Sequence, residues 1–216
     1  MAFLIPSGGQ MPIDRRSLLM FGGMCGLGFA PATARAETAG MPGLAVQAGS
    51  LPEKAVGTGA ETLYVYLSLG CPSCANFHGK TLPELRRTLV ADGRLRIVYR
   101  EFPLDVRAFA AAMIARKAGD RYFDALDLMF SEQHVWLQQR DAGPTFRRLA
   151  AQVGIDKEAY DATMADRPLY DAIGLVKDQA KGLGVRGTPT MFIRGEKVEG
   201  DLPFESISAR YAEAGR

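Results

Sequence analysis

Residues 63–74 read LYVYLSLGCPSC, and the interpretation of the whole chain starts from this stretch. Its first five residues, 63–67, form a continuous apolar and aromatic run, which is typical of a strand buried on both faces. Proline is favoured in the first turn of a helix, so Pro72 predicts a helix that begins directly after Cys71. The two cysteines, three residues apart, therefore fall at a junction between a buried strand and a helix.

Cys71 and Cys74 can close a small disulfide ring at this junction, with the sulfur of Cys71 at the helix N-terminus. The unpaired N–H groups and the helix dipole stabilise a thiolate there, which favours the reduced pair and makes the disulfide oxidising. We expect Cys71 to be the exposed nucleophile and Cys74, one turn further on, to be the buried resolving thiol. An inert structural disulfide is an alternative. Another is half of a zinc site with His78, although structural zinc takes four ligands and His134 is the one other histidine.

A second short motif lies near the C-terminal end, where residues 187–190 read GTPT and lead into a predicted strand over 190–193. Proline cannot donate to a sheet ladder, so its place directly before a strand indicates a specific role. Further strands are predicted over 95–99 and 197–198, and a closing helix over 204–211. The G-x-G-x-x-G run at 182–187 precedes a strand, whereas a dinucleotide fingerprint opens a helix, so it predicts no nucleotide site.

Residues 104–183 carry a helical pattern. Apolar side chains recur at helical spacing within 122–130, 146–153 and 169–183, which predicts three helices with core-facing stripes. The carboxylates of Asp120–Asp127 are expected on a solvated helix face. In the helix after Cys71, Pro83 predicts a kink.

Residues 1–36 have the three parts of a bacterial export signal: the basic pair Arg15 and Arg16, an apolar run over 18–30, and a small-x-small site at 34–36. The arginine pair is also typical of a twin-arginine signal; general secretion and an uncleaved N-terminal membrane anchor are the alternatives. Removal of these residues leaves 23 basic and 23 acidic residues, so charge favours no nucleic-acid partner. Two cysteines then remain, in a compartment that tolerates disulfides.

Taken together, these motifs resemble the DsbA-type thiol:disulfide oxidoreductases of the thioredoxin superfamily, in particular alphaproteobacterial members. The resemblance covers residues 55–213 and rests on CPSC at 71–74, REFPLD at 100–105 and GTPT at 187–190. It implies an α/β protein with a thioredoxin fold, in which a central mixed sheet is flanked by helices and a helical domain is inserted. The implied parts are a tether over 37–60, a thioredoxin-like domain over 61–103 and 184–216, and an inserted helical domain over 104–183.

The resemblance also implies which residues form the site, and the sequence differs from the family pattern at two points. Such proteins often bury an acid beneath the active site, whereas Val65 stands at that position here, six residues before Cys71. No further cysteine of the mature chain is available for a second, structural disulfide. The implied site consists of catalytic Cys71 and Cys74, supported by Pro72, Ser73, Thr188 and Pro189, with Pro189 in the cis form.

We therefore expect a periplasmic oxidoreductase that passes its disulfide to unfolded or reduced exported proteins and is reoxidised by a membrane partner. No cofactor or metal is expected beyond the redox-active disulfide. A monomer is expected, because the N-terminal segment shows no heptads. The alternatives are a disulfide reductase or isomerase of the same fold, and a redox-inactive peptide-binding or chaperone module that would not need Cys71.

Overall fold

The computed structural model describes residues 43–44 and 51–212, which all belong to one compact unit. The predicted export signal over 1–36 lies outside the described residues. In chain order the elements are β1 (Lys54–Val56), β2 (Glu61–Leu67), α1 (Pro72–Leu85), η1 (Arg86–Val90), β3 (Leu95–Glu101), α2 (Val106–Lys117), η2 (Gly119–Arg121), α3 (Tyr122–Ser131), α4 (Gln133–Trp136), α5 (Gly143–Gln152), α6 (Lys157–Met164), α7 (Arg167–Gly182), β4 (Thr190–Ile193), β5 (Glu196–Glu199) and α8 (Phe204–Ala212).

The five strands form one mixed sheet in the order β1-β3-β2-β4-β5, with β2 parallel to β3 and every other pair antiparallel. The strands predicted over 63–67, 95–99, 190–193 and 197–198 are confirmed as β2, β3, β4 and β5. The apolar run of β2 places it centrally: Val65 lies opposite Tyr99 of β3 on one side and Met191 of β4 on the other.

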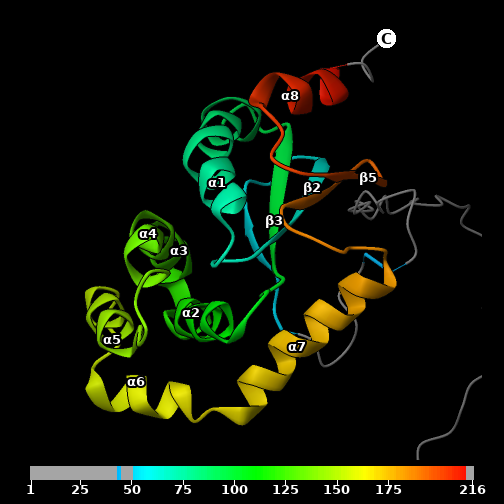
Figure 1. Cartoon of the computed structure of the whole chain (residues 1–216). Coiled ribbons are helices and arrows are strands. Elements are labelled where there is room, and N and C mark those ends of the chain that lie inside the picture. The colour runs from blue at the N-terminus through cyan, green and yellow to red at the C-terminus, as the bar shows by residue number, and fades with distance from the viewer. Residues whose placement is uncertain (1–42, 45–50, 213–216) are drawn as a thin grey trace, which may run out of the picture. The chain divides into compact units, whose positions relative to one another are not determined.

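Each face of this sheet is covered by helices (Figure 1). On one face, Leu63 and Val65 pack in a cluster with Phe77 of α1 and Ile207 of α8. On the other face, Tyr64, Val98 and Phe192 pack with Ala180 of α7 and with Val185 in the loop that follows it. Helix α7 lies in the helical segment between β3 and β4, and its C-terminal end also covers the second face of the sheet.

The segment between β3 and β4 is helical throughout, and the three predicted stripes are confirmed as α3, α5 and α7. Helices α2, α4 and α6 carried no separate sequence signal. Helix α2 shows no stripe because six of its residues between Ala108 and Ala115 are buried. It therefore lacks the polar face against which an apolar stripe would stand out.

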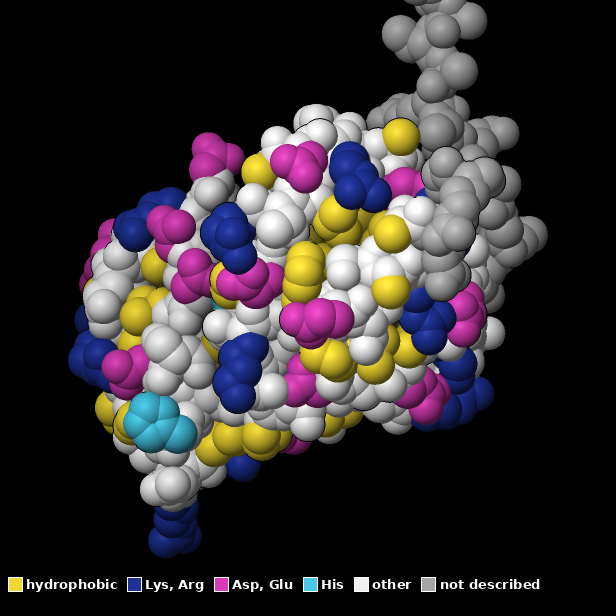
Figure 2. Space-filling model, turned by 90° about the horizontal axis from the view of Figure 1, so that it is seen from above, with side chains coloured by type: hydrophobic (Ala, Val, Ile, Leu, Met, Phe, Trp, Pro, Cys, Tyr) yellow, Lys and Arg dark blue, Asp and Glu magenta, His cyan; other side chains and the backbone are white. Residues whose placement is uncertain are grey.

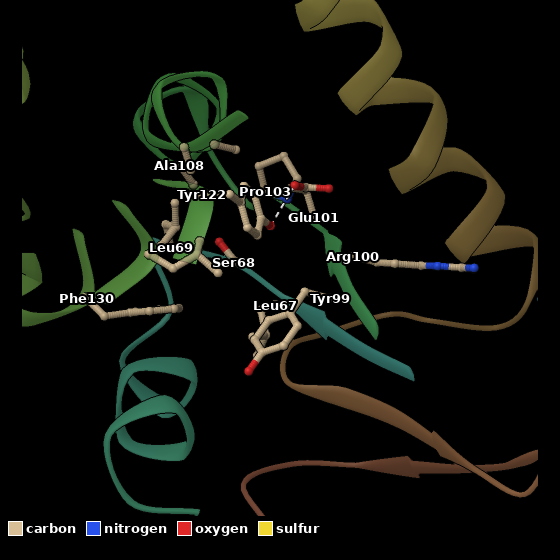
Figure 3. A pocket seen from close by; sticks show the side chains of 13 residues that line it. Leu67, Ser68, Leu69, Tyr99, Arg100, Glu101, Pro103, Ala108, Tyr122 and Phe130 are labelled. Carbon is tan, nitrogen blue, oxygen red and sulfur yellow. Dashed lines mark hydrogen bonds between the residues drawn. The ribbon is translucent and has the colours of Figure 1, made fainter. Parts of the chain in front are cut away.

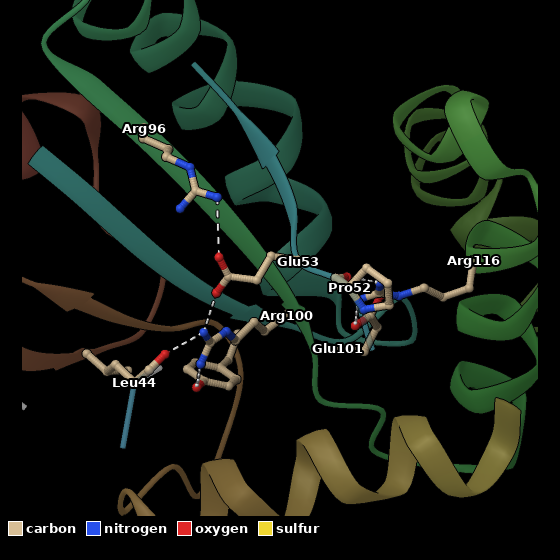
Figure 4. Close-up of polar contacts among 8 residues, drawn as sticks. Leu44, Pro52, Glu53, Arg96, Arg100, Glu101 and Arg116 are labelled. Atoms are coloured by element: carbon tan, nitrogen blue, oxygen red, sulfur yellow. Dashed lines mark hydrogen bonds and ion pairs between the residues drawn. The ribbon is translucent and has the colours of Figure 1, made fainter. Parts of the chain in front are cut away.

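Strand β1 lies within the segment predicted as an irregular tether, and that part of the prediction is wrong. Three residues are too few to show a period of two, and β1 gains its conformation by pairing antiparallel with β3. Charged groups fix the same segment to the sheet (Figure 4). Glu53 accepts hydrogen bonds from Arg96 at 3.3 Å and Arg100 at 2.5 Å, and Arg100 also donates to the carbonyl oxygen of Leu44 at 2.6 Å.

Helix α1 continues through Pro83 as far as Leu85, and the departure from α-helical geometry comes in the π-helical turn η1 that follows. The kink expected at Pro83 stays a prediction. None of the helices in the described part of the chain is long and apolar enough to cross a membrane. Figure 2 shows a face on which basic, acidic and hydrophobic side chains are interspersed, as expected for balanced charge.

Candidate active site

Cys71 is the N-cap residue of α1, at the end of the short loop that follows β2. Its backbone is extended, with φ −95° and ψ 119°, and its sulfur accepts a hydrogen bond from the backbone N–H of Cys74 at 3.4 Å. Pro72 occupies the first turn of the helix, as the sequence predicts, and the side chains of Pro72 and Ser73 are exposed. Both cysteines are free thiols. The strand-to-helix junction therefore places one sulfur at the helix N-terminus and the second one turn inside.

The environments of the two thiols drive their acidities in opposite directions. The pKa of Cys71 is lowered to about 5, chiefly because the Cys74 thiol donates a hydrogen bond to its sulfur. Burial raises this pKa. Hydrogen bonds from the Thr188 side chain and from the N–H groups of Cys74 and Ser73 lower it further. Burial raises the pKa of Cys74 well above its usual value, and its bond to Cys71 adds to the effect. The helix N-terminus contributes as predicted, but the partner thiol contributes most.

The exposures of the two cysteines differ less than the sequence suggested. Cys74 is completely buried, whereas Cys71, expected to be exposed, is 7% exposed. Cys71 is more buried than predicted because Thr188, in the loop before β4, lies against its sulfur. Of the two sulfurs, only that of Cys71 therefore belongs to a residue with exposed surface.

The loop before β4 brings Thr188 to the cysteine pair across 117 residues of sequence. The Cys71 thiol donates to the carbonyl oxygen of Thr188 at 3.2 Å, and the Thr188–Pro189 peptide bond is cis. The Thr188 hydroxyl is buried without a partner among the described residues while both cysteines are thiols. It lowers the pKa of both cysteines because it can donate to a thiolate. The two motifs that are far apart in the chain thus meet at Cys71.

Two polar side chains that the sequence analysis did not single out hold the loop between β2 and α1. Ser68, 1% exposed, accepts hydrogen bonds through Oγ from the N–H groups of Gly70 and Leu104, both at 3.3 Å. Gln133 of α4 is buried and donates to the carbonyl oxygens of Leu69 at 2.7 Å and Cys71 at 3.0 Å. Neither residue lies in a distinctive motif, because a serine after a strand and a glutamine in a short helix are ordinary. The helical segment is therefore tied directly to the active-site loop.

A cavity of about 20 Å³ lies beneath this loop, between the end of β3 and helices α2 and α3 (Figure 3). Val65 is completely buried, so the carboxylate that such proteins often place there is replaced by an apolar side chain. The buried carboxylate at the cavity is Glu101 of β3. Arg116 binds it through two hydrogen bonds of 2.5 and 2.6 Å, and the Tyr122 hydroxyl donates to it at 2.9 Å. Both carboxylate oxygens of Glu101 are therefore occupied by partners from α2 and α3.

The ring of His78, one turn after Cys74, contacts a carboxylate. Its Nε2 lies 2.6 Å from Oδ1 of Asp127, and its ring packs against Phe130 with centroids 4.6 Å apart. The hydrogen bond from His78 lowers the pKa of Asp127. The sequence predicts a solvated helix face for Asp127. Its carboxylate is exposed, and it also forms the hydrogen bond with His78. Within the described ranges, no group of three or more potential ligands could hold a metal ion.

Comparisons with known proteins agree with this architecture. Residues 58–210, most of the chain, match the family model of thioredoxin. The chain belongs to the thioredoxin family. Its fold is that of the DsbA-type members: alpha-DsbA1 of Wolbachia pipientis superposes with a TM-score of 0.67 at 25% identity, over 76% of this chain and 94% of that one. BdbD of Bacillus subtilis in its oxidised form also gives a TM-score of 0.67, over 74% of this chain and 91% of that one; at 15% identity the likeness is one of fold alone.

Two curated relatives are longer than this chain. A predicted protein-disulfide oxidoreductase of Rickettsia bellii is 26% identical over 152 residues, which are 69% of this chain and 58% of that protein. The Na(+)/H(+) antiporter NhaA 3 of Salinispora tropica is 30% identical over 158 residues, which are 71% of this chain and 23% of the antiporter. The chain thus spans somewhat over half of one relative and about a quarter of the other.

Proposed function

We propose that this protein is an exported thiol:disulfide oxidoreductase that donates the Cys71–Cys74 disulfide to reduced substrate proteins. The observation that carries the proposal is the opposite shift of the two thiols: the pKa of Cys71 is lowered to about 5, and that of Cys74 is raised. Stabilisation of the Cys71 thiolate favours the reduced pair. A disulfide whose reduced form is stabilised is a stronger oxidant, because its reduction releases more free energy.

The exchange takes two steps. A substrate thiolate attacks Sγ of Cys71, the Cys71–Cys74 bond breaks, and the sulfur of Cys74 leaves with the electron pair and takes up a proton, as its raised pKa requires. A second substrate thiolate then attacks the substrate sulfur of the mixed disulfide. The Cys71 thiolate leaves, and the substrate departs with its own disulfide. Two electrons pass from the substrate to the protein.

The low pKa of Cys71 serves the second step in particular, because a thiolate of low basicity is the better leaving group. Thr188 supports both steps. Its hydroxyl, buried without a partner among the described residues, can donate to the cysteine thiolate that leaves in each step. Its carbonyl oxygen accepts from the Cys71 thiol at 3.2 Å when the reduced pair is protonated. The substrate sulfur would approach Cys71 past Pro189 and past Pro72 and Ser73 in the first turn of α1.

The proposed setting is the periplasm, which the chain reaches through the signal at 1–36, as a monomer. A membrane partner reoxidises the pair. Replacement of Arg15 and Arg16 by lysine tests the route: retention of folded protein in the cytoplasm indicates the twin-arginine pathway, and unchanged export indicates general secretion.

The decisive measurement is the equilibrium reduction potential of the pair against glutathione. A strong oxidase lies near about −120 mV, whereas a reductase lies near about −270 mV. We expect a value above about −180 mV. A value near that of a reductase would favour the reductase alternative. A Cys71→Ser variant that still restored disulfide formation in cells would favour the redox-inactive chaperone.

A further inference from the structure

A hollow of about 410 Å³ in the surface takes no part in the chemistry described above. We call it the basic hollow. Three segments form it: the chain that follows β3, the C-terminal half of α7, and the loop between α7 and β4. Its lining consists of Phe102, Leu104, Lys177, Lys181, Val185 and Arg186.

Two walls of the basic hollow are joined to the active-site loop. The N–H of Leu104 donates to the Oγ of Ser68 at 3.3 Å, and the N–H of Cys71 donates to the carbonyl oxygen of Ser68 at 3.0 Å. On the opposite wall, Arg186 stands two residues before Thr188, whose carbonyl oxygen holds the Cys71 thiol. A peptide bound covalently at Cys71 is therefore within reach of the hollow.

The floor of the basic hollow is apolar, and its rim is positively charged. Phe102 and Val185 are 3% and 0% exposed, whereas Leu104 is 48% exposed. Lys177 lies 5.5 Å from the ring centroid of Phe102 and donates to the carbonyl oxygen of Pro103 at 2.5 Å. Lys177 is thus held over the aromatic part of the apolar floor.

These cations are mostly not neutralised. Arg186 donates to the carbonyl oxygens of Lys181 and Val185, and Lys177 to that of Pro103; carbonyl groups carry no net charge. Among the described residues, neither Lys177 nor Arg186 has a carboxylate within ion-pair distance, and Lys181 alone pairs with an exposed aspartate, Asp178. A concave surface with uncompensated cations concentrates anionic ligands.

We propose that the basic hollow receives a segment of the substrate protein in which an apolar side chain stands next to a carboxylate, close to the reacting cysteine. The apolar side chain covers Leu104 and Phe102, and the carboxylate meets Lys177 and Arg186. This inference rests on the proposed function, since it specifies the substrate class of the same site. The oxidoreductase would then react faster with cysteines in acidic, apolar stretches than with cysteines in basic ones.

The test compares three peptides that differ at one position near the cysteine: Leu-Glu, Leu-Gln and Leu-Lys. Their second-order rate constants with the oxidised protein are measured at low and high salt. We expect the Leu-Glu peptide to react about five to ten times faster than the Leu-Lys peptide at low salt, and the ratio to fall as salt rises. In the double variant Lys177→Gln/Arg186→Gln the ratio should fall to about one. Lys117→Gln, which removes an exposed cation of α2, should leave the ratio unchanged.

An unchanged peptide preference in the double variant would overturn the inference. Glutathione separates this failure from failure of the proposed function: if glutathione still reduces the pair at the wild-type rate and no peptide preference exists, the oxidoreductase stands and the basic hollow does not select its substrates.

A photo-crosslinking amino acid in place of Leu104 identifies the occupant directly. With the Leu-Glu peptide trapped on Cys71 in a Cys74→Ser background, we expect the crosslink to form to the peptide. A crosslink to another part of this chain, or to a second copy of it, would mean that the basic hollow is filled by the protein itself and would overturn the inference.

Discussion

Replacement of Cys74 tests the origin of the acidity of Cys71. The hydrogen bond from the Cys74 thiol is the largest contribution that lowers the pKa of Cys71 to about 5. Cys74→Ala removes that donor, while Cys74→Ser keeps a hydroxyl donor at the same place. We expect Cys74→Ala to raise the pKa of Cys71 by about one to two units, and Cys74→Ser to change it by less. In Cys74→Ala the value should stay below about 8.5, because the Thr188 hydroxyl and the backbone N–H groups remain.

The readout must be thiolate absorbance against pH, not reactivity at one pH. At pH 7 a thiol of pKa about 5 is about 99% ionised, against about 3% for one of pKa about 8.5, which is a gain of about 30-fold in thiolate. The intrinsic nucleophilicity of the thiolate falls by about 25- to 50-fold over the same range, so alkylation rates would barely differ. A wild-type midpoint at or above 8.5, or equal midpoints in the wild type and Cys74→Ala, would refute the reasoning.

Three further outcomes follow from the site and its supports. The unfolding free energy of the reduced protein, relative to the oxidised protein, should rise from about pH 5 to about pH 8.5, because Cys71 ionises at lower pH in the folded state than in the unfolded state. Above about pH 8.5 this free energy should fall. The pKa of Cys74 is raised in the folded state, so its thiol ionises first in the unfolded state. Denaturant titrations of both forms across this range check it, and a flat difference would contradict it. Glu101→Gln should cost about 3–5 kcal/mol of stability, since it leaves the buried Arg116 unpaired; Asp171→Asn, in an exposed pair, should cause no measurable change in the same titration. Gln133→Leu should cost about 1–3 kcal/mol because two loop carbonyls lose their donor, while exposed Gln138→Leu should not alter the midpoint.

The parts of the fold that the sequence predicted are those in which burial itself produces the pattern. Strand β2 is apolar over 63–67 because both of its faces are covered. Helix α7 shows a stripe because one side packs on α2 at Ile173 and on the sheet at Ala180. Strand β1 and helix α2 were missed for opposite reasons. The first is too short to show a period, and the second is buried around most of its circumference.

The candidate site divides in the same way. Cys71, Cys74 and the GTPT motif are recognisable because their residue types are uncommon at such positions. Ser68 and Gln133 act through hydrogen bonds to backbone carbonyl and N–H groups, which exist only once distant segments have met. The dominant effect on the pKa of Cys71 also depends on the direction in which one thiol points at another. Sequence spacing alone does not contain that direction.

The packing of α7 across the second face of the sheet limits how this protein can be dissected. If residues 104–183 were excised to leave a minimal thioredoxin, Tyr64, Val98 and Phe192 would lose Ala180 and face water. The excised form would also lose Gln133, which anchors the catalytic loop. A minimal version would therefore need a replacement helix over that face and a new donor beneath the loop. The helical segment 104–183 packs as part of the same unit as the sheet, so domain shuffling should carry both as one block.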